Sequence, residues 1–426
     1  MLFGIEGLHR AECCHFAIRT LLSGRHLCVP GANSTTMKPQ DLAHCIPPML
    51  ELSESDVVSL RELADTLVTH NLQSYRSLQV SSDGHADARR WKELRRKDDI
   101  RVYKERSAAS WSTLPCLPSL LLLGKVIGKL EDVMFVAAAS TDEQMKLTSR
   151  CIQDGVVDSK VVKSIVQPTD DHPFRHVGVK WRLRDTRDYV CLDATGITTS
   201  CNGEQLGFSI SHSVAFAKIP SLGKFGVERA NMSVCYLFLQ KTPEIVECYA
   251  RGFFDFRSDS NELFSNLSMN AVATHWLSLS KYVECAEIKK IVWRLRKNSG
   301  LPVNGPMAIE PVKITTRSVN TENDASGCSV CKRSYGFSLR RTCKICQCGV
   351  CSGCSVKKLV CVLAPDRRTI LDKKRTFCTT CMCEVTRSDA VAITRDEIRE
   401  LQRPEPQDGD LESTDERIAR YDKTSC

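Results

Sequence analysis

The chain has 426 residues, 42% hydrophobic and 26% charged, with a formal net charge of +8. These values are ordinary for a soluble globular protein, and the length suits two or three domains. No run approaches the roughly 20 apolar residues of a membrane-spanning helix, so none is predicted. Cysteines outside one cluster near the C-terminus are scattered, which indicates a reducing compartment and predicts a cytoplasmic protein.

Residues 1–50 have no clean apolar segment of the kind that a signal peptide carries. Glu6 and Glu12 interrupt the early apolar residues, and Met37 precedes a proline-containing stretch over residues 38–48. We interpret residues 1–50 as a disordered or mispredicted N-terminal segment; in the second case Met37 would be the true start and residues 1–36 would not belong to the protein.

Residues 51–98 are predicted to be helical. Ser53 can cap a helix over Ser53–Leu78 because Asp56 follows three residues later, and the helix carries an apolar stripe. A second helix is expected over Asp87–Asp99. Its basic residues form either a solvated helix face, the favoured interpretation, or a contact for lipid or nucleic acid: Arg89, Arg90, Arg95, Arg96 and Lys97.

Residues 99–297 are predicted to form an α+β domain. Gly124–Ser140 is expected to be a loop and a strand, and Thr141–Asp154 a helix capped by Thr141. Strands are predicted over Ile100–Lys104, Val177–Leu183, Tyr189–Ala194, Leu206–Ile219, Met232–Gln240 and Ile245–Phe254. One long helix over Leu263–Leu295 follows, with one apolar face that only Lys290 interrupts: Val272, Trp276, Leu279, Val283, Ala286 and Trp293.

Six stretches of this domain resemble the StAR-related lipid-transfer (START) helix-grip family: residues 99–106, 124–134, 171–174, 179–181, 187–190 and 203–213. The resemblance implies a curved antiparallel sheet, a long C-terminal helix and a pocket for a lipid or other apolar ligand. Six aromatic residues are either pocket lining or, as we favour, plain core: Trp181, Phe208, Phe216, Phe238, Phe253 and Trp276.

A linker over residues 298–327, rich in proline and glycine, leads to four consecutive CxxC pairs, within a stretch that holds 11 of the 23 cysteines. The pairs are Cys328 and Cys331, Cys343 and Cys346, Cys351 and Cys354, and Cys378 and Cys381. A CxxC pair places two thiolates on one turn, and two pairs make one closed zinc site, so two Zn²⁺ ions are predicted. Disulfides are the alternative. Cys348, Cys361 and Cys383 are expected to be free thiols.

All ten histidines lie at or before His275, so residues 328–383 differ from the RING and PHD modules, which use histidine. Their spacing resembles the FYVE zinc finger. With both modules the chain resembles proteins of water moulds (oomycetes) that join a START-like domain to a FYVE-type finger. That resemblance implies a cross-brace, in which the first and third CxxC pairs hold one zinc and the second and fourth hold the other. The family's RRHHCR motif appears without histidine as residues 340–344, and its upstream WxxD is absent. The zinc scaffold is therefore expected, whereas recognition of phosphatidylinositol 3-phosphate does not follow.

Between Cys328 and Cys381 twelve Lys and Arg face two Asp, a net charge of +10. This charge suits anionic lipid headgroups or nucleic acid, or it is a solubilising surface. The candidate headgroup contacts are Arg340, Arg341, Lys344 and Arg375. Residues 384–426 are predicted to be a mostly disordered tail with a short helix near Ile393–Leu401.

No phosphate-binding loop, HExxH motif or other catalytic constellation is found, so we predict a non-enzyme. The predicted function is a zinc-dependent cytoplasmic binding protein. Its START-like domain would hold an apolar ligand, and its finger would dock on anionic, phosphoinositide-containing membranes such as endosomes. The alternative is a zinc-finger adaptor for protein or nucleic acid without a lipid ligand, with nucleic acid the less favoured partner; a ubiquitin ligase ranks third.

Overall fold

The computed structural model describes residues 39–106, 117–199, 203–256, 262–299, 327–335, 340–364 and 369–402. Most of the N-terminal segment with Met37, residues 300–326 of the linker and residues 403–426 of the tail lie outside the described residues. Within the described part, no helix combines the length and apolar character that crossing a membrane requires.

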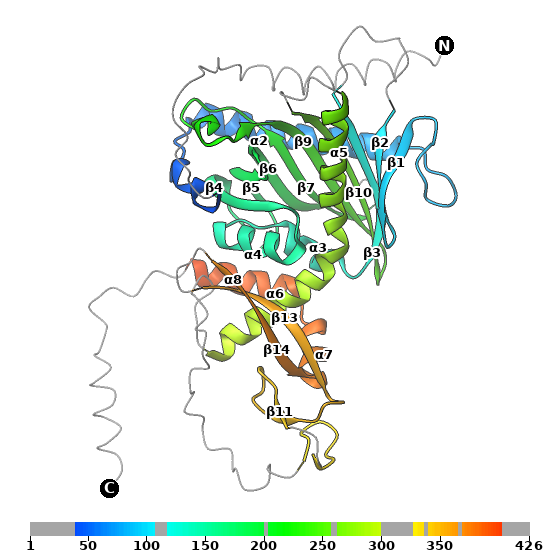
Figure 1. The fold of residues 1–426 in the computed structure, drawn as a ribbon, viewed down its shortest axis with the longest axis vertical. Coiled ribbons are helices and arrows are strands. Elements are labelled where there is room, and N and C mark those ends of the chain that lie inside the picture. Colours follow the sequence, from blue (N-terminus) through cyan, green and yellow to red (C-terminus); the bar gives the residue numbers. More distant parts are fainter. Residues whose placement is uncertain are drawn as a thin grey trace, which may run out of the picture.

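One large sheet organises the fold, in the order β1-β2-β3-β10-β9-β7-β6-β5-β4, with β8 paired to β6. All pairings are antiparallel except that of β8, which is parallel. Figure 1 shows the sheet curving behind the helix α5. The strands are β1 (Trp91–Lys97), β2 (Ile100–Glu105), β3 (Ser119–Ile127), β4 (Val156–Val166), β5 (His176–Arg184), β6 (Arg187–Thr199), β7 (Gln205–Ser213), β8 (Glu228–Arg229), β9 (Asn231–Thr242) and β10 (Ile245–Asp255).

Helices cover both faces of this sheet. The 3-10 helix η1 (Pro39–Cys45) and α2 (Glu54–Arg76) pack with one face, and a short 3-10 turn, η2 (Gly223–Phe225), lies in a loop. The other face carries α3 (Leu130–Ala137), α4 (Asp142–Ile152), α5 (Glu262–Trp276), η3 (Leu277–Lys281) and α6 (Tyr282–Ser299). A separate hydrophobic cluster fills each side. The predicted α+β class, a curved antiparallel sheet with C-terminal helix, is confirmed.

Two helix caps form as the sequence predicts. Ser53 and Asp56 make a reciprocal capping box at the start of α2, with the Ser53 Oγ accepting from the Asp56 N–H at 3.1 Å. Thr141 caps α4 by accepting from the Gln144 N–H at 3.2 Å. Short-range hydrogen bonds of this kind depend only on neighbouring residues, which is why sequence alone predicts them.

Two local predictions are wrong. The helix expected over Asp87–Asp99 is replaced by strand β1, because Trp91 is buried to 3% exposure and the strand pairs with β2, which leaves its charged side chains exposed at the sheet edge. Gly124–Ser140 contains the helix α3 where a strand was expected, and Val133 and Met134 are fully buried in it. A short, continuously apolar run does not distinguish a buried helix from a strand. Strand β4 was not predicted.

The single helix predicted over Leu263–Leu295 is two helices joined by η3. α5 lies on the sheet, where the Trp276 ring covers Gly252 so closely that a Cβ there would be 2.8 Å from it. After η3 the chain turns away, and α6 packs on α3 and on the cysteine-rich module (Figure 1). The predicted apolar stripe packs in the core as expected. Lys290 is buried and forms an ion pair with Asp132 at 2.7 Å.

The C-terminal part forms two two-stranded ribbons, β11 with β12 and β13 with β14, and two helices. These elements are β11 (Arg341–Thr342), β12 (Gly349–Val350), β13 (Ser355–Leu363), β14 (Ile370–Cys378), α7 (Thr379–Arg387) and α8 (Ala390–Leu401). The helix predicted near Ile393–Leu401 exists and begins at Ala390. Ala390 and Ile393 belong to the core of the large domain, and Asp396 accepts from the Trp293 indole at 2.8 Å. Residues 384–402 are therefore part of the fold, and the remainder of the tail that was predicted to be mostly disordered, residues 403–426, lies outside the described residues.

His212 makes stability depend on pH. It is fully buried with its Nδ1 2.9 Å from the Ser233 Oγ, and burial lowers its pKa to about 4. An unfolded histidine titrates near 6.5, so the unfolded state takes up a proton first and stability falls from about pH 6.5 to 4. We expect His212 to contribute about 2 kcal/mol to the loss of unfolding free energy between pH 7 and 5. Urea titrations of wild type and His212→Gln at pH 7 and pH 5 measure the contribution of His212. If the free energy of unfolding fell equally in both proteins, the prediction would be contradicted.

Candidate metal centre and basic surface

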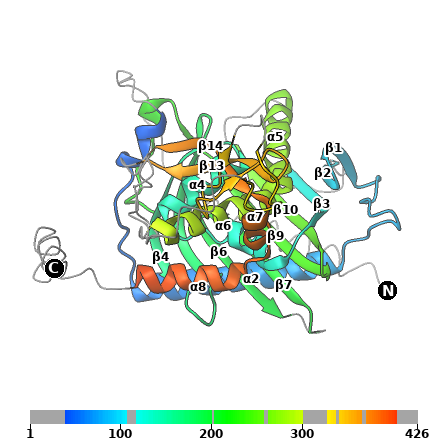
Figure 2. The same cartoon turned by 90° about the horizontal axis from the view of Figure 1, so that it is seen from below.

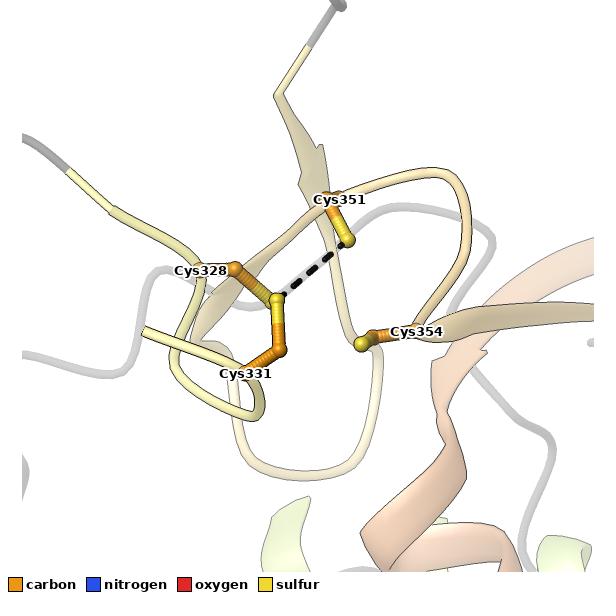
Figure 3. Close-up of side chains that lie close together, drawn as sticks. All are labelled: Cys328, Cys331, Cys351 and Cys354. Carbon is orange, nitrogen blue, oxygen red and sulfur yellow. Dashed lines mark hydrogen bonds between the residues drawn. The ribbon is translucent and has the colours of Figure 1, made fainter. Parts of the chain in front are cut away.

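Eight cysteines gather into two groups of four. Within each group the thiols lie within 4.8 Å of one another. The groups are Cys328, Cys331, Cys351 and Cys354, and Cys343, Cys346, Cys378 and Cys381. This is the interleaved grouping that the FYVE resemblance implies. Figure 3 shows the four thiols of the first group turned toward one another.

The sulfur separations suit a metal rather than disulfides. Cys331 and Cys351 lie 3.9 Å apart at their Sγ atoms, as do Cys346 and Cys378. A disulfide requires about 2.05 Å. Four thiolates at about 2.3 Å around a tetrahedral ion lie roughly 3.8 Å apart. The residues present therefore fit a tetrahedral ion, and each group could hold one.

Equivalent turns position the first CxxC pair of each group. Lys332 and Gln347 follow these pairs with positive φ angles of 62° and 60°. Their N–H groups donate to the carbonyls of Cys328 and Cys343 at 2.8 and 3.0 Å. Each turn thus brings both thiols of the pair to one side. The sequence signal is the CxxC spacing itself.

Backbone dipoles favour a thiolate in each group. Burial by itself opposes a charged Cys328, but N–H groups of Cys331 and Cys351 lower its pKa to about 6. The pKa of Cys343 is likewise lowered by the N–H groups of Cys346 and Cys378, against the effect of burial. A closed set of four thiolates leaves no open position for a reacting water, so the chemistry is that of a structural site.

The finger, residues 327–387, shares its core with α6. Ile288, Ile291 and Val292 of α6 pack in one cluster with finger residues that include Val350 and Phe377. Lys358 of β13 bonds Glu287 of α6 at 2.6 Å, the Asn298 amide donates to the Ile345 carbonyl at 2.9 Å, and Arg150 of α4 pairs with Asp372. Sequence reasoning missed this contact. The signal was a second apolar face on the helix, off the predicted stripe.

The structure separates the four candidate headgroup residues. Arg341 donates to the Ser355 Oγ at 2.9 Å, and the Lys344 N–H donates to the Thr376 carbonyl at 2.9 Å, so both adjoin the β13–β14 ribbon. Arg340 is exposed and lies over the Tyr335 ring at 5.9 Å. Arg375 is the cross-strand partner of Lys358, on the ribbon face that turns toward α6. It therefore does not share a surface with Arg341.

The interior of the large domain holds a buried charged cluster that sequence reasoning also missed. The Asp193 carboxylate lies 3.4 Å from the Lys180 Nζ, pairs with Arg182, and accepts from the Ser211 Oγ at 2.9 Å. The Lys180 Nζ also donates to the Ala139 carbonyl at 2.7 Å. The signal was the alternation of β5, in which Lys180 and Arg182 occupy the face opposite Trp181.

The aromatic residues considered as pocket lining divide between the two faces. Phe238 and Trp276 lie in the cluster on the side of α5 and α6. Trp181, Phe208 and Phe216 belong to the cluster under α2, where the Trp181 indole donates to Asp188 at 2.8 Å. Phe253 is half-buried with the Arg251 guanidinium 5.1 Å from its ring centre. Of the six aromatic residues, only Phe238 and Trp276 therefore lie on the side of the sheet that the C-terminal helices cover.

No family model matches the chain, and no curated protein matches it. Among solved structures it is similar to human StAR-related lipid transfer protein 5, at 14% identity over 53% of this chain and 97% of that one, with TM-score 0.37. It is also similar to human STARD10, at 12% identity over 59% and 86%, with TM-score 0.36. A STAR-related lipid transfer protein from Xanthomonas axonopodis matches at 12% identity over 45% and 97%, with TM-score 0.31.

The class of protein is defined by the chain's own topology. A curved antiparallel sheet with C-terminal helices, the arrangement that the START resemblance predicts, carries a small module with two groups of four cysteines.

Proposed function

We propose that this chain is a zinc-dependent lipid- and membrane-binding protein of the cytoplasm. Its START-like domain would hold an apolar ligand, and its finger, with two Zn²⁺ ions, would dock on anionic membranes, including phosphoinositide-containing endosomal ones. The observation that supports this most directly is the pair of closed four-cysteine groups within a module of net charge +10.

Zinc is the metal that the donor set favours. Four thiolates in tetrahedral arrangement suit Zn²⁺, whereas Mg²⁺ and Ca²⁺ prefer oxygen ligands. The eight cysteines would bind two ions, and the free energy of binding would become folding free energy for the finger. The role proposed for the metal is therefore structural, in a protein that is not an enzyme.

The membrane is the partner that the charge favours. Arg340 is exposed, and Arg341 and Lys344 are partly exposed beside it on the same module. Each basic residue near an anionic leaflet contributes about 1 kcal/mol, so three of them would strengthen binding by about two decades. Specific recognition of phosphatidylinositol 3-phosphate would need further contacts, because the histidines of the family motif are absent.

Replacing Arg340, Arg341 and Lys344 with Ala tests this proposal. We expect the triple variant of the zinc-loaded chain to bind phosphatidylserine-containing vesicles about 100-fold more weakly than wild type in sedimentation assays at low salt. A matched control removes three exposed basic residues in and just before the edge strand β1, as Arg89, Lys92 and Arg96 to Ala. Equal weakening by both triple variants, or none by the finger variant, would contradict docking through the finger.

A further inference from the structure

The β13–β14 ribbon has two unlike faces. Cross-strand partners share a face, and Val360 with Val362 lie buried in the cluster formed with α6. The opposite side is buried at Cys361 and Leu363, but its other end is exposed; we call this end, formed by Lys357, Leu359 and Lys374, the outer ribbon face. All three are exposed, and Leu359 retains 53% of its surface. Leu359 is the direct cross-strand partner of Lys374.

Neighbouring contacts delimit this face. Toward α4 it ends at Asp372, which pairs with Arg150. In Figure 2 the ribbon lies over α4 and α6, so its covered side is the one turned toward the large domain. Toward the metal groups the face continues into the Arg341 side chain, because Arg341 donates to Ser355, two residues before Lys357. The outer ribbon face therefore has a single leucine between lysines, with further basic residues beside it.

We infer that the outer ribbon face is the part of the finger that enters an anionic bilayer, with Leu359 reaching the acyl boundary and Lys357 and Lys374 contacting lipid phosphates. This inference rests on the proposed membrane function and assigns its contact surface. A bilayer interface offers an apolar layer beneath a plane of phosphates, which matches one leucine flanked by two lysines whose stems are themselves apolar. Nucleic acid offers the phosphates without an apolar layer for the leucine.

Two variants separate the apolar from the charged part of the contact. Leu359→Gln in the full zinc-loaded chain should weaken binding to phosphatidylcholine vesicles with 30% phosphatidylserine about fivefold, at low and at high salt alike. Lys357→Ala with Lys374→Ala should weaken it about 30-fold at low salt and much less at high salt, because salt screens these charges. The matched control is Leu267→Gln on α5, where a leucine retains 65% of its surface away from the finger; it should bind like wild type.

The outcomes of these experiments distinguish this inference from the proposed function, membrane docking through the finger. Wild-type binding by Leu359→Gln, or an equal loss with Leu267→Gln, overturns the outer ribbon face as the contact. If the Arg340, Arg341 and Lys344 variant loses binding while both ribbon variants keep it, the finger docks through another surface. A wild-type chain that binds no anionic vesicle refutes the proposed function and this inference together. Zinc content and thermal unfolding of both ribbon variants and of Leu267→Gln should equal those of wild type, since the side chains that they replace are exposed.

Discussion

Removing the metal should loosen the large domain as well as the finger. We expect a strong chelator to lower the midpoint of thermal unfolding of the whole chain by more than about 10 °C, because each structural zinc supplies about 10–16 kcal/mol of apparent binding free energy. Four cysteines of the two groups, Cys328, Cys343, Cys378 and Cys381, belong to the same cluster as Ile288, Ile291 and Val292 of α6. Collapse of the finger would expose these side chains, and α6 in turn packs on α3 of the large domain.

Hydrogen exchange of the backbone amides shows which helices are destabilised when the metal is removed. With chelator, α6 and α8 should lose protection together with the finger, since α8 follows the finger and packs on the large domain through Ala390 and Ile393. Cys378→Ser, which removes one ligand, should reproduce the effect. Cys383→Ser should not, because Cys383 is exposed and outside both four-cysteine groups. Unchanged protection of α6 and α8 after the finger unfolds would show that the finger is an independent module.

Asp193→Ala should destabilise the chain by about 3–5 kcal/mol. The substitution leaves Lys180 and Arg182 without the carboxylate that they share, and an unpaired buried charge costs several kcal/mol. Lys180 is only 2% exposed, so water cannot replace the carboxylate without opening the structure. Urea unfolding measures the loss. Asp65→Ala on the exposed side of α2 is the control and should lie within about 0.5 kcal/mol of wild type.

The stabilisation by the Asp193 carboxylate should also depend on pH in the acid range. Burial would raise the pKa of Asp193, but the positive charges of Arg182 and Lys180 hold it at about 2. Because an unfolded aspartate titrates near 3.9, this stabilisation is complete above about pH 4 and is lost as the pH falls toward 2. A mutant whose stability equals that of wild type at pH 7 would mean that Lys180 and Arg182 find other partners.

Several features follow from residues close together in the chain. The CxxC spacing predicts the metal ligands, since two thiols on one turn require only a local backbone conformation. Ser53 and Asp56 form their capping box for the same reason. The alternation of Val177–Leu183 predicts strand β5, and the strand succession followed by an apolar helix predicts the α+β class.

What only the tertiary structure decides are the contacts between distant segments. Charged residues 91–97 become a strand because β2 pairs with them, and the apolar run 130–137 becomes a helix because the sheet and α6 surround it. Pairing register places Arg375 on the covered side of the ribbon and Leu359 on the exposed side. The packing of the finger on α6 likewise depends on contacts between side chains about 50 to 90 residues apart in the chain. The stability that such contacts contribute cannot be read from neighbouring residues. The amino-acid pattern therefore determined the fold class and the candidate metal ligands, while packing decided which surfaces remain exposed.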